Sequence, residues 1–262
     1  MTEFSLEQFS LGGKVAVVTG AGGRGNSIGR AYAKGLASAG ASVVVADLNL
    51  EGANAVADEI TSSGGSAIAV AVDVAEEAST KAMAAAATEA FGGVDILVNN
   101  AALMVDISYD SLETVGMEEW RKAFSVNLDG ALLCSRAVVP SMRERGGGAI
   151  VNQTSGGAFP ASGLYGVTKL ALVGLTTSLA KQFGKDNITC NAIAPGNVAS
   201  DAGKMLAPDG SPFLQFLENV VATKAQGQPD ELVGTLLLLC SDAGKWITGQ
   251  TINVDGGWIM RS

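Results

Sequence analysis

The chain has 262 residues, which suits one large α/β domain, and 47% of them are hydrophobic against 16% charged. Its net charge of −9 argues against nucleic-acid binding, which depends on lysine and arginine to neutralise phosphates. The chain has no histidine and three isolated cysteines without metal-ligand spacing, so we expect no metal site and a reducing, cytoplasmic setting. We find no signal-peptide pattern and no run of about 18 uncharged apolar residues, so we expect no membrane association.

Short apolar runs alternate with alanine-rich helical stretches along the chain. We expect strands at 14–19, 42–47, 67–72, 94–98, 149–154, 188–193 and 251–254. We expect helices between them at 28–39, 51–62, 76–91, 117–145 and 164–183. Continuous apolar strands bounded by helices predict a doubly wound (Rossmann) α/β fold, with a parallel seven-stranded sheet covered by helices on both faces. We expect a single domain over 1–262, with an N-terminal extension at 1–12.

The stretch 197–226 shows no clear helical or strand periodicity and contains the turn sequence Pro208-Asp209-Gly210. Long irregular segments in compact domains are often lids or binding loops. We therefore expect this stretch to be a substrate-binding loop or lid.

Tyr165 and Lys169 stand four residues apart in a predicted helix, where they share one face. A free tyrosine titrates near ~10, and a neighbouring lysine charge stabilises the phenolate and lowers that pKa. The pair therefore offers an acid/base group near neutral pH in a chain without histidine. Taken alone, the spacing also fits an ordinary surface pair, so its interpretation depends on the rest of the chain.

A glycine-rich turn at 19–29 follows the first predicted strand and opens the first helix. Such glycines let the backbone approach a pyrophosphate, and a helix N-terminus favours the anion. Asp47 ends the second strand, where a carboxylate can bind the adenosine ribose hydroxyls and repel a 2′-phosphate. This favours NAD over NADP, although Arg24 could reach a 2′-phosphate. A turn without ligand, and Asp47 as a helix N-cap, are the alternatives.

Polar, glycine or proline residues follow four further strands. They are Asp73-Val74, Asn99-Asn100-Ala101, Ser155 and Pro195-Gly196. Ligands bind outside the carboxyl ends of strands in open α/β sheets. Each residue could be an ordinary turn signal, but their joint placement favours a binding site along this edge.

Together with Val126-Asn127-Leu128 and the stretch 248–257, these segments resemble the short-chain dehydrogenase/reductase family over almost the full chain. The resemblance implies that Tyr165 exchanges a proton with the substrate oxygen, and that Lys169 lowers the Tyr165 pKa and holds the nicotinamide ribose. It implies that Ser155 donates a hydrogen bond to that oxygen, and that Asn127 holds a water in a proton relay behind Lys169. The cofactor-binding residues expected from motif and resemblance are Gly20, Gly22, Asn26, Ser27, Ile28, Asp47, Leu48, Asp73, Val74, Asn99, Ala101, Tyr165, Lys169, Pro195, Gly196 and Val198.

The chain departs from the family pattern at three places. The glycine turn is longer than the usual Thr-Gly-x3-Gly-x-Gly, with Ser27 at the place of the middle glycine. The interval from Ser155 to Tyr165 is shorter than usual, which makes Thr154 an alternative to Ser155. Ala102 replaces a glycine after Asn99-Asn100-Ala101.

We expect an NAD(H)-dependent oxidoreductase that acts on a secondary alcohol or its ketone. A similar stretched glycine turn occurs in the enoyl-reductase branch, but that branch spaces its tyrosine and lysine farther apart than Tyr165 and Lys169. Reduction of a 3-oxoacyl thioester uses the same residues and stays open, and an inactive nucleotide-binding scaffold is the alternative outside enzymes.

Mostly apolar residues are candidates for the substrate pocket, although packing is an equal alternative for them: Leu103, Met104, Phe159, Leu164, Met205, Phe213 and Phe216. They favour a hydrophobic alcohol or ketone. The resemblance implies a homotetramer in which the helices that begin near Met117 and Leu164 pair between subunits, and the tail at 256–260 lies at another interface. A dimer is the alternative.

Overall fold

The structure, a computed structural model, describes residues 5–23, 25–107 and 111–260. Its described residues form one parallel sheet with the strand order β3-β2-β1-β4-β5-β6-β7. The strands are β1 (Val15–Thr19), β2 (Ser42–Asp47), β3 (Ser66–Ala71), β4 (Ile96–Asn99), β5 (Gly148–Gln153), β6 (Ile188–Pro195) and β7 (Thr251–Val254). The predicted seven-stranded, doubly wound sheet is therefore confirmed.

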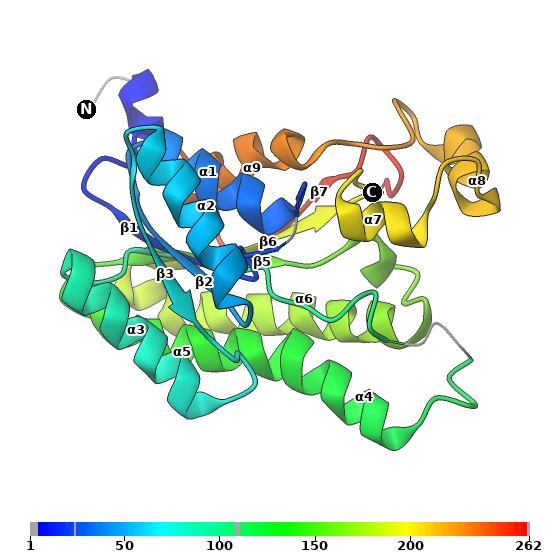
Figure 1. Cartoon of the computed structure of the whole chain (residues 1–262), viewed down its shortest axis with the longest axis horizontal. Coiled ribbons are helices and arrows are strands. Elements are labelled where there is room, and N and C mark those ends of the chain that lie inside the picture. Colours follow the sequence, from blue (N-terminus) through cyan, green and yellow to red (C-terminus); the bar gives the residue numbers. More distant parts are fainter. Residues whose placement is uncertain (1–4, 24, 108–110, 261–262) are drawn as a thin grey trace.

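Helices cover both faces of the sheet, as predicted (Figure 1). One face carries α1 (Ile28–Ser38), α2 (Leu50–Ser62) and α9 (Val233–Cys240). The other face carries α3 (Glu77–Phe91), α5 (Gly130–Glu144) and α6 (Gly163–Phe183). Alternate residues of each strand enter the two cores, so that Val18 and Val98 pack on the first face, and Val17 and Leu97 on the second.

Five short helical turns of the described chain lie between these helices and strands or before them. They are η1 (Leu6–Phe9), η3 (Gly156–Ala158), η4 (Gly184–Asp186), η5 (Pro229–Leu232) and η6 (Asp242–Gly244). Leu11, within the predicted N-terminal extension, is fully buried, and its N–H donates to the Ala39 carbonyl at 2.8 Å. The end of that extension is therefore part of the first core.

The three cysteines are buried and unpaired, as expected of small core residues. Burial raises the pKa of the Cys134 and Cys190 thiols to about 12, so both are protonated at neutral pH. Protonated, buried thiols are poor nucleophiles, and they act here as apolar packing groups.

The prediction of one uninterrupted α-helix at 117–145 is wrong. The segment consists of α4 (Met117–Phe124), a π-helical turn η2 (Ser125–Asp129) and α5. A π-turn adds a residue to the helical repeat and so changes which face the following residues occupy. Here the turn contains Asn127, which is buried and hydrogen-bonded to Leu103 and Thr168.

The segment 197–226 contains two short helices, α7 (Asp201–Leu206) and α8 (Pro212–Val220), rather than irregular chain alone. Ser200 and Ser211 cap them, and each helix is too short to show a periodic pattern in the sequence. Backbone hydrogen bonds from Gly227 to Asn197 (2.9 Å) and from Ala199 to Gly227 (2.8 Å) join the two ends of the segment. Figure 1 shows α7 and α8 together at one end of the molecule.

The segment Gly163–Asp186 is long and apolar enough to cross a membrane by length and composition. It contains Lys169 and Lys181, so it is not an uncharged apolar run, and the expectation from the sequence concerned only such runs. In the fold this segment forms α6 and the turn η4. The helix α6 packs against β6 and contains the buried side chains of Lys169, Leu172 and Leu179. A core helix gives the same compositional signal as a membrane-spanning helix.

Candidate active site

The first turns of α6 bring Tyr165 and Lys169 together. The Lys169 Nζ atom lies 5.6 Å from the centre of the Tyr165 ring and donates a hydrogen bond to the Gln153 carbonyl oxygen at 2.8 Å. The Lys169 side chain is 1% exposed, whereas Tyr165 is half-buried. A buried amine is thus fixed beside an accessible phenol at the carboxyl end of β5.

Burial changes the pKa of Lys169. Loss of solvation disfavours the charged ammonium and lowers the pKa of Lys169 to about 7. An amine with such a pKa can gain or lose a proton near neutral pH, so this residue can exchange protons as well as carry charge.

The structure distinguishes Ser155 from Thr154. Thr154 is 1% exposed, and its hydroxyl donates to the Ile193 carbonyl at 3.0 Å in the neighbouring strand. Ser155 is half-buried, and its oxygen accepts the Gly157 N–H at 3.1 Å. The Ser155 O–H can still donate to a ligand, whereas the Thr154 hydroxyl is committed to the sheet.

Asn127 connects the loop after β4 to α6. Its Oδ1 accepts the Leu103 N–H at 2.7 Å, and its Nδ2 donates to the Leu103 carbonyl at 3.0 Å and to Thr168 Oγ1 at 3.1 Å. The Thr168 hydroxyl in turn donates to the Tyr165 carbonyl at 2.8 Å. The Asn127 side chain therefore holds the helical turn that presents Tyr165.

A cavity of about 10 Å³ lies beside Asn127, at the size of a single water molecule. Asn99 also lines it, and the buried Asn99 Oδ1 has no hydrogen-bond partner in the described structure. The other Asn99 amide atom, Nδ2, donates to Asn152 Oδ1 at 2.8 Å. Asn99 thus ties β4 to β5 beneath the predicted site rather than pointing out of it.

The glycine turn packs closely against the end of β4. Gly20 has a φ of +65°, and a Cβ there would lie 2.7 Å from the Ala101 Cα atom. Thr19 Oγ1 accepts the N–H groups of Asn100 (3.1 Å) and Ala101 (3.2 Å). Asn100 Nδ2 donates to the Gly20 carbonyl at 2.9 Å. Only glycine allows this approach of two backbones at position 20.

Asp47 is held by the same turn. Its Oδ2 accepts the Gly22 N–H at 2.8 Å, and its Oδ1 accepts the Asn49 N–H at 2.9 Å. The N-cap of α2 is Asn49, so the alternative role of Asp47 as that cap is wrong. The carboxylate of Asp47 is fixed beside the turn, with Leu48 exposed next to it.

Ser27 and Ile28 mark the start of α1. The Ser27 side chain caps the helix by accepting the Arg30 N–H at 3.2 Å, and α1 begins at Ile28. The positive end of the helix dipole therefore lies at the glycine turn, which suits an anionic group. Asn26 instead contacts Ala199 and Asp201, and Arg24 lies outside the described residues.

The remaining predicted residues follow β3 and β6. Asp73 Oδ1 accepts the Ala75 N–H at 3.0 Å, and Val74 is buried beside the small cavity. Pro195 ends β6, Gly196 donates to the Val254 carbonyl at 3.1 Å, and Val198 pairs with Gly227. All of them lie along the carboxyl edge of the sheet.

Thr19 and Asn100 lie in segments that the sequence analysis named, but their roles in holding the turn against the β4 loop come from the structure. Sequence reasoning missed Thr168 and the Gln153 carbonyl, which hold Tyr165 and Lys169 in place. Thr168 could have been found from its position three residues after Tyr165, because i and i+3 share a helix face. The Gln153 carbonyl depends on a contact between distant segments and leaves no local signal.

The chain is similar to known proteins over most of its length. Residues 23–259 match the family model described as "Enoyl-(Acyl carrier protein) reductase". An uncharacterised oxidoreductase of Mycobacterium tuberculosis is 50% identical over 252 residues, which cover 95% of this chain and 98% of that protein. A 3-oxoacyl-[acyl-carrier-protein] reductase of Synechocystis is 38% identical and covers 96% of this chain and 99% of its own.

Solved structures match over nearly the whole fold. A 7 alpha-hydroxysteroid dehydrogenase complexed with NADH and 7-oxo glycochenodeoxycholic acid has a TM-score of 0.88 at 36% identity, covering 97% of this chain and 98% of its own. The chain is a short-chain dehydrogenase/reductase. A gluconate 5-dehydrogenase from Burkholderia cenocepacia in complex with NADP and tartrate has a TM-score of 0.89 at 33% identity. The match covers 97% of this chain and 98% of that one.

As a short-chain dehydrogenase/reductase, the chain is an oxidoreductase that uses a nicotinamide cofactor on an alcohol or ketone. The residues present fit such a cofactor. The glycine turn, the N-terminus of α1 and the fixed Asp47 carboxylate lie together at the edge that Tyr165 and Lys169 also face.

Proposed function

We propose that the chain is an NAD(H)-dependent dehydrogenase/reductase of apolar secondary alcohols and their ketones, with Tyr165 as its acid/base group. The observation that carries the proposal is the placement of the Lys169 amine 5.6 Å from the Tyr165 ring and 2.8 Å from the Gln153 carbonyl oxygen, two residues before Ser155. A nicotinamide bound along this edge would accept or supply the hydride.

The residues of the chain account for the proton and for substrate orientation. In alcohol oxidation, the Tyr165 phenolate takes the hydroxyl proton as the C–H hydride leaves the carbinol carbon, and ketone reduction reverses both transfers. Lys169 supports the phenolate by its charge, and its lowered pKa lets it pass the proton onward. The Ser155 O–H donates to the substrate oxygen and fixes its position.

Asp47 supports NAD rather than NADP. Both of its carboxylate oxygens accept backbone N–H groups, so its negative charge stays at the end of β2, beside the expected adenosine ribose. A 2′-phosphate placed there would be repelled. Relatives of this fold bind either cofactor, so the preference of this chain is a proposal from Asp47 alone.

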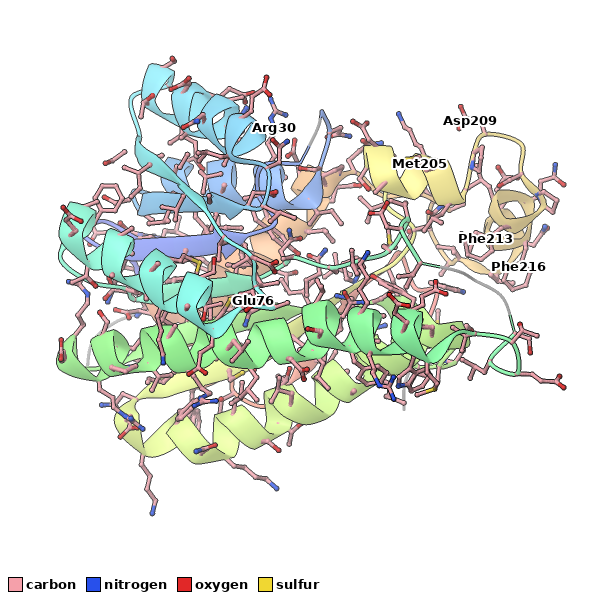
Figure 2. All side chains as sticks on the ribbon, turned by 60° about the horizontal axis from the view of Figure 1, so that its bottom comes forward. Arg30, Glu76, Met205, Asp209, Phe213 and Phe216 are labelled. Atoms are coloured by element: carbon pink, nitrogen blue, oxygen red, sulfur yellow. The ribbon has the colours of Figure 1, made fainter. Side chains whose placement is uncertain are left out.

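The lid supports an apolar substrate. Met205 on α7 and Phe213 and Phe216 on α8 are 69%, 44% and 52% exposed, and Figure 2 labels them at the end of the molecule formed by these two helices. Large apolar side chains in a segment that follows β6 suit the cover of a hydrophobic ligand. One relative is named a 7 alpha-hydroxysteroid dehydrogenase and was solved with 7-oxo glycochenodeoxycholic acid.

Reduction of a 3-oxoacyl thioester remains the second candidate. It needs the same Tyr165, Lys169 and Ser155, and the relative from Synechocystis carries that activity in its name. The two candidates differ in what is attached to the reacting carbon, which is an apolar group in one and a thioester arm in the other.

We also propose a homotetramer in a cytoplasmic setting. The outer side of α6 presents Leu170 at 43% exposure together with Gly174 and Val173, a surface of small and apolar residues suited to pairing with a second copy. The unpaired cysteines support a reducing compartment. Light scattering and cell fractionation test these two points.

The proposed function is tested by steady-state absorbance at the nicotinamide band. NAD and NADP are offered with hydroxysteroids, small secondary alcohols and polyols, and the reduced cofactors with the matching ketones and 3-oxoacyl thioesters. We expect NAD-linked turnover of the bulky apolar alcohols, and its loss by about 10²–10⁴-fold or more in Tyr165→Phe. A Phe216→Ser variant should raise KM for bulky but not for small alcohols.

Each other result has a definite meaning. Preference for 3-oxoacyl thioesters would establish the second candidate. Tight binding of NADH without turnover of any substrate would favour an inactive nucleotide-binding scaffold. Full activity in Tyr165→Phe would contradict the mechanism.

A further inference from the structure

The lengthened glycine turn is hydrogen-bonded to the start of α7. The Asn26 N–H donates to Asp201 Oδ2 at 3.2 Å, and the Asp201 N–H donates to the Asn26 carbonyl at 3.0 Å. The Asn26 side-chain Nδ2 donates to the Ala199 carbonyl at 2.9 Å. Asn26 and Asp201 are 175 residues apart in the chain, so these bonds join two distant loops.

Gly25 allows this contact. Its φ is +58°, a left-handed conformation that favours glycine, and a Cβ at this position would collide with Asp201 Oδ2. The approach of the two loops thus depends on a glycine at 25, a residue with donor and acceptor groups at 26 and a carboxylate at 201.

The contact crosses the edge where the site lies. The turn that holds Asn26 follows β1, and Ala199 and Asp201 follow β6, with β4 and β5 between them in the sheet. Three strand spacings place β1 and β6 about 14 Å apart. The bonded loops therefore bridge the interval between the carboxyl ends of β1 and β6, and β4 and β5 end between these two strands.

We propose that Gly25, Asn26 and Asp201 form a latch over the bound dinucleotide, which slows its release and holds α7 in place. This inference rests on the proposed cofactor site between the glycine turn and the loop after β6. Both Asn26 and Asp201 are exposed to solvent, so the latch can open without unfolding of either core. Exposed hydrogen bonds contribute modestly, so the latch delays release rather than preventing it.

The test is a stopped-flow measurement of cofactor release from the full chain. Protein loaded with NADH, and separately with NADPH, is mixed with excess oxidised cofactor, and the loss of bound-cofactor fluorescence gives the dissociation rate. Equilibrium titration of the unmodified chain with each cofactor comes first. We expect Asp201→Ala and Asn26→Ala each to speed release about tenfold, which corresponds to about 1.4 kcal/mol.

Two further variants separate the latch from other effects. Asp201→Asn keeps an acceptor oxygen without the charge and should release cofactor at close to the original rate. Asp209→Ala removes a carboxylate from the turn between α7 and α8, away from the latch, and serves as the matched control (Figure 2). The double variant Asn26→Ala/Asp201→Ala removes both side-chain bonds of the latch and should release cofactor at least as fast as either single variant.

The outcomes for the latch and for the proposed function are distinct. Failure of the unmodified chain to bind either cofactor would overturn both. Normal binding with unchanged release rates in the latch variants, or equal acceleration in Asp209→Ala, would overturn the latch alone. A double variant that releases cofactor no faster than the unmodified chain would also overturn the latch.

Discussion

The Lys169 amine lies 5.6 Å from the centre of the Tyr165 ring and is tethered to the Gln153 carbonyl, the last residue of β5. The tether fixes the amine from the sheet while α6 fixes the phenol, so two different elements hold the pair. The distance between the two groups is therefore set by packing of α6 on the sheet, and not by the helix alone.

The stability of the protein should depend on Lys169 above neutral pH. Burial lowers the pKa of Lys169 to about 7, below the ~10.4 of an unfolded chain. Between these values the unfolded chain binds a proton that the folded chain lacks, so the contribution of Lys169 to the free energy of unfolding rises with pH. Below about pH 7, Lys169 is protonated in both the folded and the unfolded chain. Its contribution to the free energy of unfolding is then independent of pH and at its least favourable value.

Replacing Lys169 with methionine tests this dependence. Denaturant unfolding of wild type and Lys169→Met is compared from about pH 7 to about pH 10, the window that the two pKa values define. We expect the wild type to gain stability relative to the variant as the pH rises. If the free energies of unfolding of the two proteins changed in parallel between about pH 7 and about pH 10, the Lys169 amine would not be desolvated in the folded chain.

Thr168 should act as a positioning residue for Tyr165. It accepts from Asn127 Nδ2 and donates to the Tyr165 carbonyl, so Thr168→Val removes both bonds while keeping the side-chain volume. Small displacements of a catalytic group are costly, and we expect kcat to fall by about tenfold with little change in cofactor binding. Thr168→Ser keeps the hydroxyl and should restore kcat. Equal losses in both variants would indicate a packing effect instead.

Asp47 should determine the choice of cofactor. Asp47→Asn removes the charge while keeping one acceptor oxygen for the turn. We expect the ratio of kcat/KM for NADP to that for NAD to rise by about tenfold or more, because a 2′-phosphate is no longer repelled. The matched control is Asp73→Asn, which removes a carboxylate after the neighbouring strand β3 and should leave the ratio unchanged. An unchanged ratio in Asp47→Asn would contradict the assignment.

Tyr32 should be more stable as phenylalanine. Tyr32 lies on the buried face of α1, where its side chain is fully enclosed in the core. Its hydroxyl has no hydrogen-bond partner within the described structure. Burial raises the pKa of Tyr32 well above its usual value, because the phenolate would be desolvated there. Removing an unsatisfied buried hydroxyl should increase the free energy of unfolding by about 1 kcal/mol.

Denaturant unfolding of Tyr32→Phe measures this gain, and turnover should not change because Tyr32 belongs to the core and not to the site. The comparison variant is Tyr32→Leu, which leaves unfilled space and should destabilise the fold. A loss of stability in Tyr32→Phe would mean that the hydroxyl has a partner in solution, such as an ordered water.

The sequence predicted the fold because the pattern is local. Continuous apolar runs such as 42–47 indicate strands buried on both faces, and the alternation with helices requires parallel pairing. The relation of Tyr165 to Lys169 was also local, since a helix places i and i+4 on one face. Asp47 could be placed at the edge of the site for the same reason, because it directly follows an apolar strand.

The predicted boundaries failed where tertiary contacts override local propensity. The interval 117–145 has a continuous helical pattern, yet contacts of Asn127 with Leu103 and Thr168 accompany a π-turn inside it. In 197–226, α7 and α8 are too short for periodicity to identify, and their caps and the pairing of Val198 with Gly227 place them.

By itself, the sequence determined the order of strands and helices, the spacing of Tyr165 and Lys169 on one helix and the residues at the carboxyl ends of the strands. The tertiary structure decided which of those side chains are committed to contacts within the fold. In the structure Asn99 is hydrogen-bonded to Asn152 within the sheet, and the Thr154 hydroxyl is bonded to Ile193 whereas the Ser155 O–H can still donate. Asn26 is hydrogen-bonded to Asp201. The physical reason is that hydrogen bonds between segments far apart in the chain depend on how the segments pack, and local residue patterns do not encode that packing.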